Sequence, residues 1–219
     1  MEGISLNHVF FGLIAMGIAL GLVFAGGKPA VKPTKFQALL EGYLRFVRNM
    51  LLDNIGSAGL KYTPLIASIG LFIFFSNLLG MIPGFEAPTG NINTNLAMAL
   101  IVFLYYNYEG IRQHGIGYFK HFTGPVIWLA PFFVVVEIIS HIARPITLSL
   151  RLFANMKGGA ILLLALLGLA IKNPFTMALS PIALVFIIAI KFLAVFIQTY
   201  VFMILSVVYL AGAVVHEEH

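Results

Sequence analysis

Polar side chains recur at helical spacing inside a long apolar segment in the second half of the chain. They follow one another in steps of four or three, which places them on one face of a helix. This stripe consists of Glu137, His141, Arg144, Leu148, Arg151 and Asn155, and Leu148 is its one apolar member. Ser140 lies in the same segment. A carboxylate, an imidazole and guanidinium groups in such surroundings normally face water, an ion pathway or another protein's charge.

Arg151 is the hardest member of this stripe to explain as a purely structural residue. The acid in the same segment is Glu137, 14 residues earlier, which is roughly 21 Å along a straight helix. A charged side chain at the centre of a bilayer costs on the order of 2.5–3.5 kcal/mol. We therefore expect Arg151 to face a carboxylate of another subunit. Glu137 has a simpler alternative, a structural pairing with His141 or Arg144, and Arg144 could also snorkel towards a membrane interface.

A second apolar segment contributes Lys191 and Gln198, which are seven residues apart and so share one helical face. If this face met the stripe that contains Arg151, the two helices would form a polar seam within lipid. A lysine at such a seam needs water or an anion nearby. The spacing therefore predicts that Lys191 borders a hydrated vestibule.

The composition is that of a helical membrane protein. Of its 219 residues, 60% are hydrophobic and 10% are charged, whereas soluble domains are about half apolar and a quarter charged. Several apolar runs exceed 18 residues and none alternates with period two, which favours helices over a barrel. There is no cysteine, "HEEH" reads as a plain tail, and no phosphate loop occurs, so we expect no metal and no cofactor.

The apolar runs predict an all-α polytopic protein that forms a single membrane domain over residues 1–219. About five crossings are expected, together with a basic amphipathic helix on the membrane surface or, alternatively, a soluble linker helix. The first run is expected to be retained because "MEGISLNH" lacks the basic residues of a signal peptide. The crossings are placed at 8–26, 62–83, 95–108, 124–170 and 175–214, and the surface helix at 34–55.

The basic residues predict the orientation of the chain. Lys and Arg gather in the loops at 27–61 and 109–123, so these loops should face the cytoplasm, with the N-terminus outside and the C-terminus inside. The net charge of +5 is thus a topology signal and does not indicate nucleic-acid binding. Each of the last two segments has 40 residues or more, which is roughly 60 Å of helix or more and about twice the hydrocarbon thickness. We expect them to form a strongly tilted hairpin.

Three stretches of this sequence resemble a known family. "SLRLFANMKGG", the downstream "IQTYVFMILSVVYL" and the earlier "NLLGMIPGF…PTGNINTNLAMAL" are similar to the a subunit of the F-type ATP synthase. The resemblance covers the chain from about residue 62 to the end. It implies a bacterial inner-membrane stator subunit, not catalytic by itself, beside a rotating ring of c subunits, with b-type peripheral stalk subunits and membrane lipid as further partners.

The resemblance also implies roles for individual residues. Protons, or sodium ions in some members, would pass through two offset half-channels to and from the ring carboxylates. Arg151 falls on the essential arginine, which would stabilise the ionised carboxylate and block a direct leak between the half-channels. Glu137 falls on the acid of the cytoplasmic-side path, and Asn155 and Gln198 on flanking polar positions. Many members have an acid where this chain has Ala160, and many have a histidine or another residue where it has Lys191.

Two other functions compete with this interpretation. A secondary transporter would be expected to show internal repeats with broken helices in matching positions, and no repeat is visible. A structural membrane scaffold would have no need for an embedded polar stripe opposite Lys191 and Gln198. Co-purification with a ring of small two-helix subunits would separate all three functions.

Overall fold

The computed structural model describes residues 6–25, 34–82, 85, 87–115, 130–170 and 174–214. Within these residues all regular structure is helical and no strand occurs, which confirms the predicted all-α class. The elements in chain order are α1 (Leu6–Ala25), α2 (Lys35–Ile55), η1 (Ser57–Tyr62), α3 (Thr63–Leu79), η2 (Pro88–Gly90), α4 (Ile92–His114), α5 (Ala130–Ala170) and α6 (Pro174–Val214).

Three stretches in the described part of the chain are long and apolar enough to cross a membrane. They are Ser57–Leu79, Phe132–Leu166 and Ser180–Val214, and Val9–Gly21 is a shorter apolar stretch. The chain is therefore a polytopic membrane protein. The predicted crossing at 95–108 lies within α4, which is less apolar because it carries buried Asn95 and Glu109.

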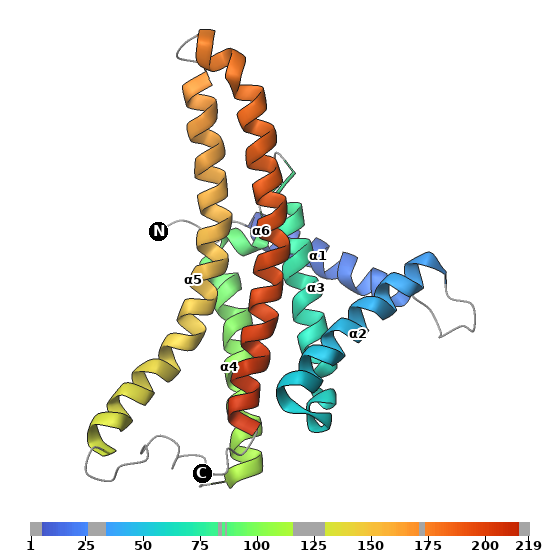
Figure 1. Ribbon diagram of the computed structural model, residues 1–219, viewed down its shortest axis with the longest axis vertical. Helices are drawn as coiled ribbons and strands as arrows, with labels where there is room; N and C mark the ends of the chain where they lie inside the picture. The colour runs from blue at the N-terminus through green and yellow to red at the C-terminus, as the bar shows by residue number, and fades with distance from the viewer. Residues whose placement is uncertain are drawn as a thin grey trace.

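The last two helices are the longest elements and lie side by side as a hairpin that extends beyond the rest of the molecule (Figure 1). Each has 41 residues, and this long pair agrees with the expectation from the sequence. The first part of α5 bends away from α6 (Figure 1). Pro145 lies inside α5, and a proline at that position removes a backbone hydrogen bond and favours such a bend.

The core forms where α3, α4 and the second half of α6 meet. Phe202, Ser206 and Leu210 recur every four residues on α6 and are all buried. Tyr62 and Ile73 from the α3 side and Val102 from α4 pack into the same cluster. The first half of α6 is mostly exposed, so much of the α5–α6 hairpin presents apolar side chains outwards.

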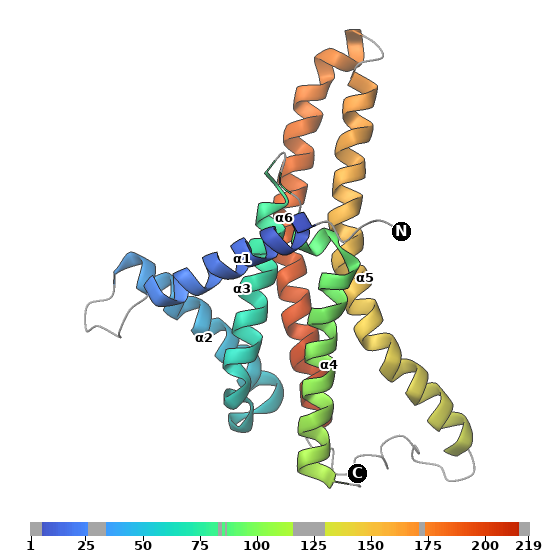
Figure 2. The same cartoon turned by 180° about the vertical axis from the view of Figure 1, so that it is seen from behind.

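The amphipathic helix α2 lies outside this bundle, against α3 and α6. Thr34 caps its start by accepting a hydrogen bond from the backbone N–H of Gln37, at 3.3 Å. Gly56 ends it with a φ of +81°, a conformation that favours glycine. Val47 and Leu51 are fully buried against the core. Seen from behind, α1 and α2 project to the same side, away from the α5–α6 hairpin (Figure 2).

Two predicted segments differ from the structure by more than two residues at an end. The helix placed at 95–108 runs from Ile92 to His114, so residues 109–114, which we expected in a loop, are helical. The extension follows from the burial of Glu109 against Lys61 and Tyr62, which holds this end of α4 in place. The helix placed at 62–83 ends at Leu79. Residues 124–129 of the predicted fourth crossing lie outside the described residues.

Candidate functional site

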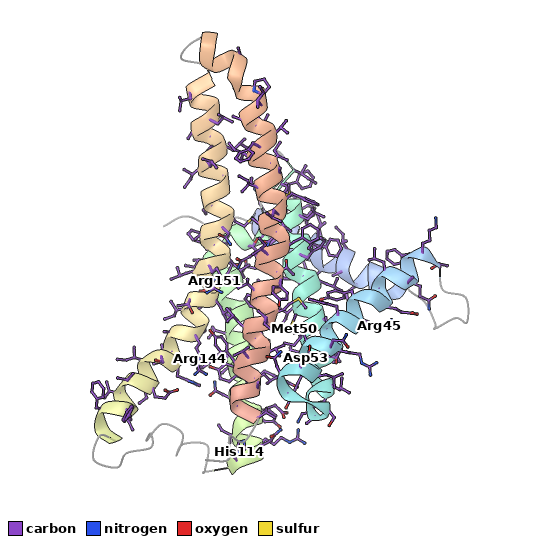
Figure 3. The ribbon with its side chains drawn as sticks, in the orientation of Figure 1. Arg45, Met50, Asp53, His114, Arg144 and Arg151 are labelled. Atoms are coloured by element: carbon purple, nitrogen blue, oxygen red, sulfur yellow. The ribbon has the colours of Figure 1, made fainter. Side chains whose placement is uncertain are left out.

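Arg151 lies near the middle of α5, on the C-terminal side of the bend, and its side chain is exposed (Figure 3). Leu148 and Leu152 on the adjoining face are almost fully buried. Leu150, beside Arg151, is 45% exposed. Among the described residues, no ion pair involves Arg151. The structure thus presents a permanent cation at the edge of an outward apolar surface, with no ion-pair partner among the residues that the structure describes.

Asn155, one turn further along α5, contacts α6 directly. Its Nδ2 donates to Oε1 of Gln198 at 2.5 Å. Gln198 is only 3% exposed, and its Nε2 is a buried donor with no acceptor in the described part of the protein. The two residues that the sequence placed on facing stripes are therefore brought together, with one strong donor left to bind water or an anion.

A small cavity of about 20 Å³ adjoins this contact. It is lined by Asn155 and Met156 from α5, by Lys191, Ala194, Val195 and Gln198 from α6, and by Gly80 and Met81 at the end of α3. A cavity of roughly 10–15 Å³ or more can hold one water molecule if polar groups are there to bind it. In this mostly apolar cavity the polar groups come from Asn155, Lys191 and Gln198. The end of α3 is thus a third wall of the seam, which the sequence analysis did not anticipate.

Lys191 reaches this cavity by crossing Gly159. A Cβ atom built on Gly159 would lie 2.9 Å from Cε of Lys191, so the lysine stem occupies the space that any larger residue would need. Lys191 itself is half-buried, whereas Ala160 is exposed. The stem of Lys191 therefore packs against Gly159.

The first part of α5 holds the other members of the predicted stripe. Glu137 Oε1 and Arg144 Nη2 lie 3.6 Å apart, with side chains 42% and 31% exposed. The guanidinium of Arg144 also lies over the ring of Tyr209 on α6, 5.2 Å from its centroid. The structural pairing considered for Glu137 is thus present, and its partner is Arg144. Ser140 is exposed on the same stretch.

His141 connects this part of α5 to α4. Its Nε2 lies 2.8 Å from Oδ1 of Asn107, whose Nδ2 donates to the carbonyl of Phe103 at 2.7 Å. Because the amide nitrogen is already donating, the amide oxygen accepts from Nε2–H of His141. The imidazole also packs against the rings of Phe103 and Tyr106. His141 is therefore oriented by α4.

A buried polar cluster near the start of α4 was not anticipated from the sequence. Asn91 caps the helix, because its side chain accepts a hydrogen bond from the N–H of Asn93, whereas Asn77 and Asn95 are both fully buried. Oδ1 of Asn77 accepts from Thr89 at 2.6 Å.

This cluster has unused hydrogen-bonding capacity. Ser76 Oγ, Asn77 Nδ2 and Asn95 Oδ1 are buried and have no partner among the described residues. Buried polar atoms in proteins are normally satisfied by protein or by ordered water. The cluster is therefore a candidate hydrated site close to the cavity at Gly80. The signal in the sequence was the adjacent Ser76 and Asn77 inside an otherwise apolar helix.

A buried carboxylate, that of Glu109, lies at the opposite end of α4. Glu109, 4% exposed, accepts hydrogen bonds from Lys61 Nζ and from Tyr62 Oη, both at 2.8 Å. Arg112 Nη1 lies 3.4 Å from its other oxygen. The hydrogen bond from Lys61 is the main cause that lowers the pKa of Glu109, against the opposing effect of burial. This contact joins η1 to α4.

Fold and site together define a class: a polytopic helical membrane protein with an unpaired arginine on an outward helix face. A family model described as "ATP synthase A chain" matches residues 9–211. The chain is 71% identical over 213 residues to the ATP synthase subunit a of Aquifex aeolicus, covering 97% of this chain and 99% of that protein. It is 58% identical over 213 residues to that of Hydrogenobaculum sp., covering 97% and 98%. The chain belongs to this family, as a membrane-sector subunit of the F-type ATP synthase.

Proposed function

We propose that this subunit is the ion-conducting stator of the ATP synthase, and that it passes protons to and from carboxylates of a rotating c-ring through two offset half-channels. The observation that carries this proposal is the exposed, unpaired Arg151 on α5. Exposed apolar side chains beside it, such as Leu150 and Ile146, give a surface against which another subunit can pack. A ring carboxylate that arrives there would be stabilised in its ionised form and would give up its proton.

The role suits an arginine in particular. Its guanidinium stays protonated even when water is excluded, whereas a lysine can lose its proton when buried. A fixed cation between two half-channels also opposes the direct passage of a proton from one to the other. Arg151 would thus link ion flow to rotation, since a ring site could pass it only by exchanging its proton.

The cytoplasmic-side path is assigned to the first part of α5, with Glu137, Ser140, His141 and Arg144 along it. Its support is the bend that separates this part of α5 from α6 (Figure 1) and the partial exposure of both Glu137 and Arg144. The orientation from the basic loops, with the C-terminus in the cytoplasm, places this end of the stripe on the cytoplasmic side.

The outer path is assigned to the seam of Asn155, Gln198 and Lys191. The unpartnered Nε2 of Gln198 and the adjoining cavity support it. The unsatisfied polar atoms around Asn77 and Asn95 extend it towards the loop between α3 and α4. Water at these atoms would carry protons from the outer surface to the ring beside Arg151.

The whole assignment is tested by reconstituting the complete ATP synthase in vesicles and recording ATP-driven acidification with a pH-sensitive dye, with and without sodium. We expect acidification that does not require sodium, and co-purification of a ring of c subunits and of b-type stalk subunits. Isolation of an active assembly without a ring would contradict the stator role.

A cysteine at position 137 is expected to react with a water-soluble thiol reagent or with silver ion. The physical reason is the 42% exposure of Glu137 on a path that we assign to water. The chain has no cysteine of its own, so the label would report this position alone. Ile139→Cys is a matched control, because Ile139 is 63% exposed on an apolar face that lipid would cover. Inertness of both positions in active protein would favour a purely structural ion pair between Glu137 and Arg144.

Lys191→Ala is expected to slow pumping roughly tenfold or less while leaving it coupled, a barrier change of about 1 kcal/mol. The reason is that Lys191 lines the outer cavity but lies on α6, apart from the stripe that carries Arg151. Initial pumping rates between pH 6 and 9 would measure the effect, with Lys157→Ala as a control for loss of one exposed cation on α5. Introducing Ala160→Glu should change the effect of Lys191→Ala in a double-mutant cycle. If Lys191→Ala pumped at the full wild-type rate across this pH range, a role of Lys191 in the outer path would be excluded.

A further inference from the structure

One side chain of α4 holds the imidazole of His141 in a single orientation. Oδ1 of Asn107 lies 2.8 Å from Nε2 of His141, and Nδ2 of Asn107 donates to the carbonyl oxygen of Phe103 at 2.7 Å. The second hydrogen bond decides which end of the amide faces the imidazole, because turning the amide over would bring its oxygen against another carbonyl oxygen. Nε2 of His141 therefore carries a hydrogen and donates it to Asn107.

Aromatic rings keep the imidazole from turning away from this contact. The ring of His141 lies 5.0 Å from that of Phe103 and 5.5 Å from that of Tyr106, measured between centroids. Tyr106 is only 1% exposed and belongs to the core, so close packing holds its ring in place. Tyr106 and Asn107 follow Phe103 by three and four residues, so the three side chains share one face of α4. This helix lies beside α5 in Figure 2.

The tautomer of His141 decides which of its atoms can take up a proton. A neutral imidazole carries its hydrogen on one nitrogen and its lone pair on the other. With Nε2–H donated to Asn107, the lone pair is on Nδ1. A proton that binds Nδ1 forms an imidazolium, and the same N–H bond breaks when the proton leaves. Passage through the ring to Nε2 is closed, because the atom beyond Nε2 is an amide oxygen, which accepts a hydrogen bond but does not take over the proton.

Titratable groups of three helices surround this imidazole. Glu137 lies one turn before His141 on α5 and Arg144 lies about one turn after it, and these two form the ion pair described above. Tyr106 of α4 contacts the imidazole, and Tyr209 of α6 packs against Tyr106 with ring centroids 6.2 Å apart. His141 itself is half-buried, so water on the path assigned to this part of α5 can reach it.

We propose that Asn107 is a positioning residue of the cytoplasmic-side path, which fixes the Nε2–H tautomer of His141 and so makes Nδ1 the atom that exchanges protons with that path. This inference rests on the proposed function, because it requires protons to pass along the first part of α5. His141 takes up a proton at Nδ1 and returns it from the same atom. It therefore holds a proton beside the path and is not a link through which protons pass.

Solid-state NMR of the complete ATP synthase in vesicles, with ¹⁵N-labelled histidine, tests the tautomer independently of transport. The signal of His141 is the difference between the spectra of the wild-type protein and of His141→Gln. The shifts of its two ring nitrogens show which one carries the hydrogen, and we expect Nε2–H at alkaline pH. Asn107→Leu should lower the ratio of Nε2–H to Nδ1–H roughly fivefold, as expected for loss of one neutral hydrogen bond. Asn107→Asp keeps the acceptor and should keep the tautomer.

ATP-driven pumping tests whether His141 exchanges protons with the path. His141→Gln keeps a side-chain N–H that can reach Asn107 but has no group that titrates. The dependence of pumping on pH between about 5 and 8, where an imidazole titrates, should therefore become flatter. Asn107→Leu should slow pumping roughly fivefold and displace this pH dependence. In the His141→Gln background the same change at Asn107 should have no further effect.

Asn54→Leu is a matched control, because Nδ2 of Asn54 donates to the carbonyl of Met50 at 2.8 Å, again four residues earlier, but on α2. It should leave the tautomer of His141 and the pH profile unchanged. An Nδ1–H tautomer in the wild-type protein, or an unchanged ratio in Asn107→Leu, would overturn the inference.

Wild-type pumping by His141→Gln at every pH would also overturn the inference. If Asn107→Leu did not assemble, the wild-type tautomer and the pH profile of His141→Gln would still decide the question. Failure of the proposed function has a different signature, namely coupled pumping by Arg151→Ala, and this result would leave the tautomer of His141 as expected.

Discussion

Replacing Arg151 with alanine is expected to abolish ATP-driven proton pumping, with a fall of more than about 100-fold, or roughly 3 kcal/mol or more in the barrier. The ring carboxylate would lose the charge that stabilises its ionised form, and no other cation of α5 can replace it. Arg144 is held by Glu137 and Tyr209 on the far side of the bend. Initial rates of dye quenching in reconstituted vesicles would measure the loss.

Two further variants test whether the position of the charge and its permanence both matter at Arg151. Lys157→Ala removes an exposed cation six residues later on the same helix and should pump normally. Arg151→Lys keeps a cation that can be neutralised on burial, so it should recover little or none of the rate. Passive proton leak through Arg151→Ala should rise because the barrier between the half-channels is gone. Coupled pumping at the wild-type rate by Arg151→Ala would refute the proposed mechanism.

The second large effect is expected on stability, from Glu109→Ala. This change removes the acceptor of the Tyr62 hydroxyl, and Tyr62 is fully buried. It also leaves Lys61 and Arg112 near each other without their shared anion, although both are exposed enough to regain water. An unsatisfied buried donor and a lost charged hydrogen bond together cost about 2–4 kcal/mol. Thermal unfolding of the purified complex in detergent would show this as a lower Tm for this subunit.

Comparison with milder variants identifies which interaction of Glu109 accounts for the expected loss of stability. Arg112→Gln should cost less than about 1 kcal/mol, because Arg112 is 66% exposed and its ion pair is screened. Tyr62→Phe removes the donor together with its need for an acceptor, so combining it with Glu109→Ala should recover part of the loss. If Glu109→Ala unfolded at the wild-type temperature, the contact between η1 and α4 would contribute nothing to stability.

Glu109 also makes the stability of this end of α4 dependent on pH. The hydrogen bond from Lys61 lowers the folded-state pKa of Glu109 below its usual value. Its contribution to stability is therefore fully present above the unfolded pKa of about 4.3 and is lost as the pH falls through the lower folded value. Glu109→Gln should unfold with a smaller dependence on pH in this acid range.

The length and spacing of apolar residues were sufficient to determine the membrane class and the long final helices. Helical periodicity also placed Glu137, Arg144 and Arg151 on one stripe, because residues three and four apart share a face wherever a helix forms. The unpaired state of Arg151 among the described residues followed from the same reasoning. The membrane class, the long helices and the stripe depend on residues that are close together in the sequence. The unpaired state of Arg151 depends on the lack of acidic residues near it in the sequence.

Contacts between helices were decided only by the tertiary structure. No local pattern indicated that Lys191 crosses Gly159, that His141 is oriented by Asn107, or that Glu109 accepts a hydrogen bond from Lys61, 48 residues earlier. The burial of Asn77 and Asn95 has the same origin. Each depends on the crossing angle and the axial register of two packed helices. Ridges and grooves along the whole of both surfaces set these quantities, so the spacing within one helix does not specify them.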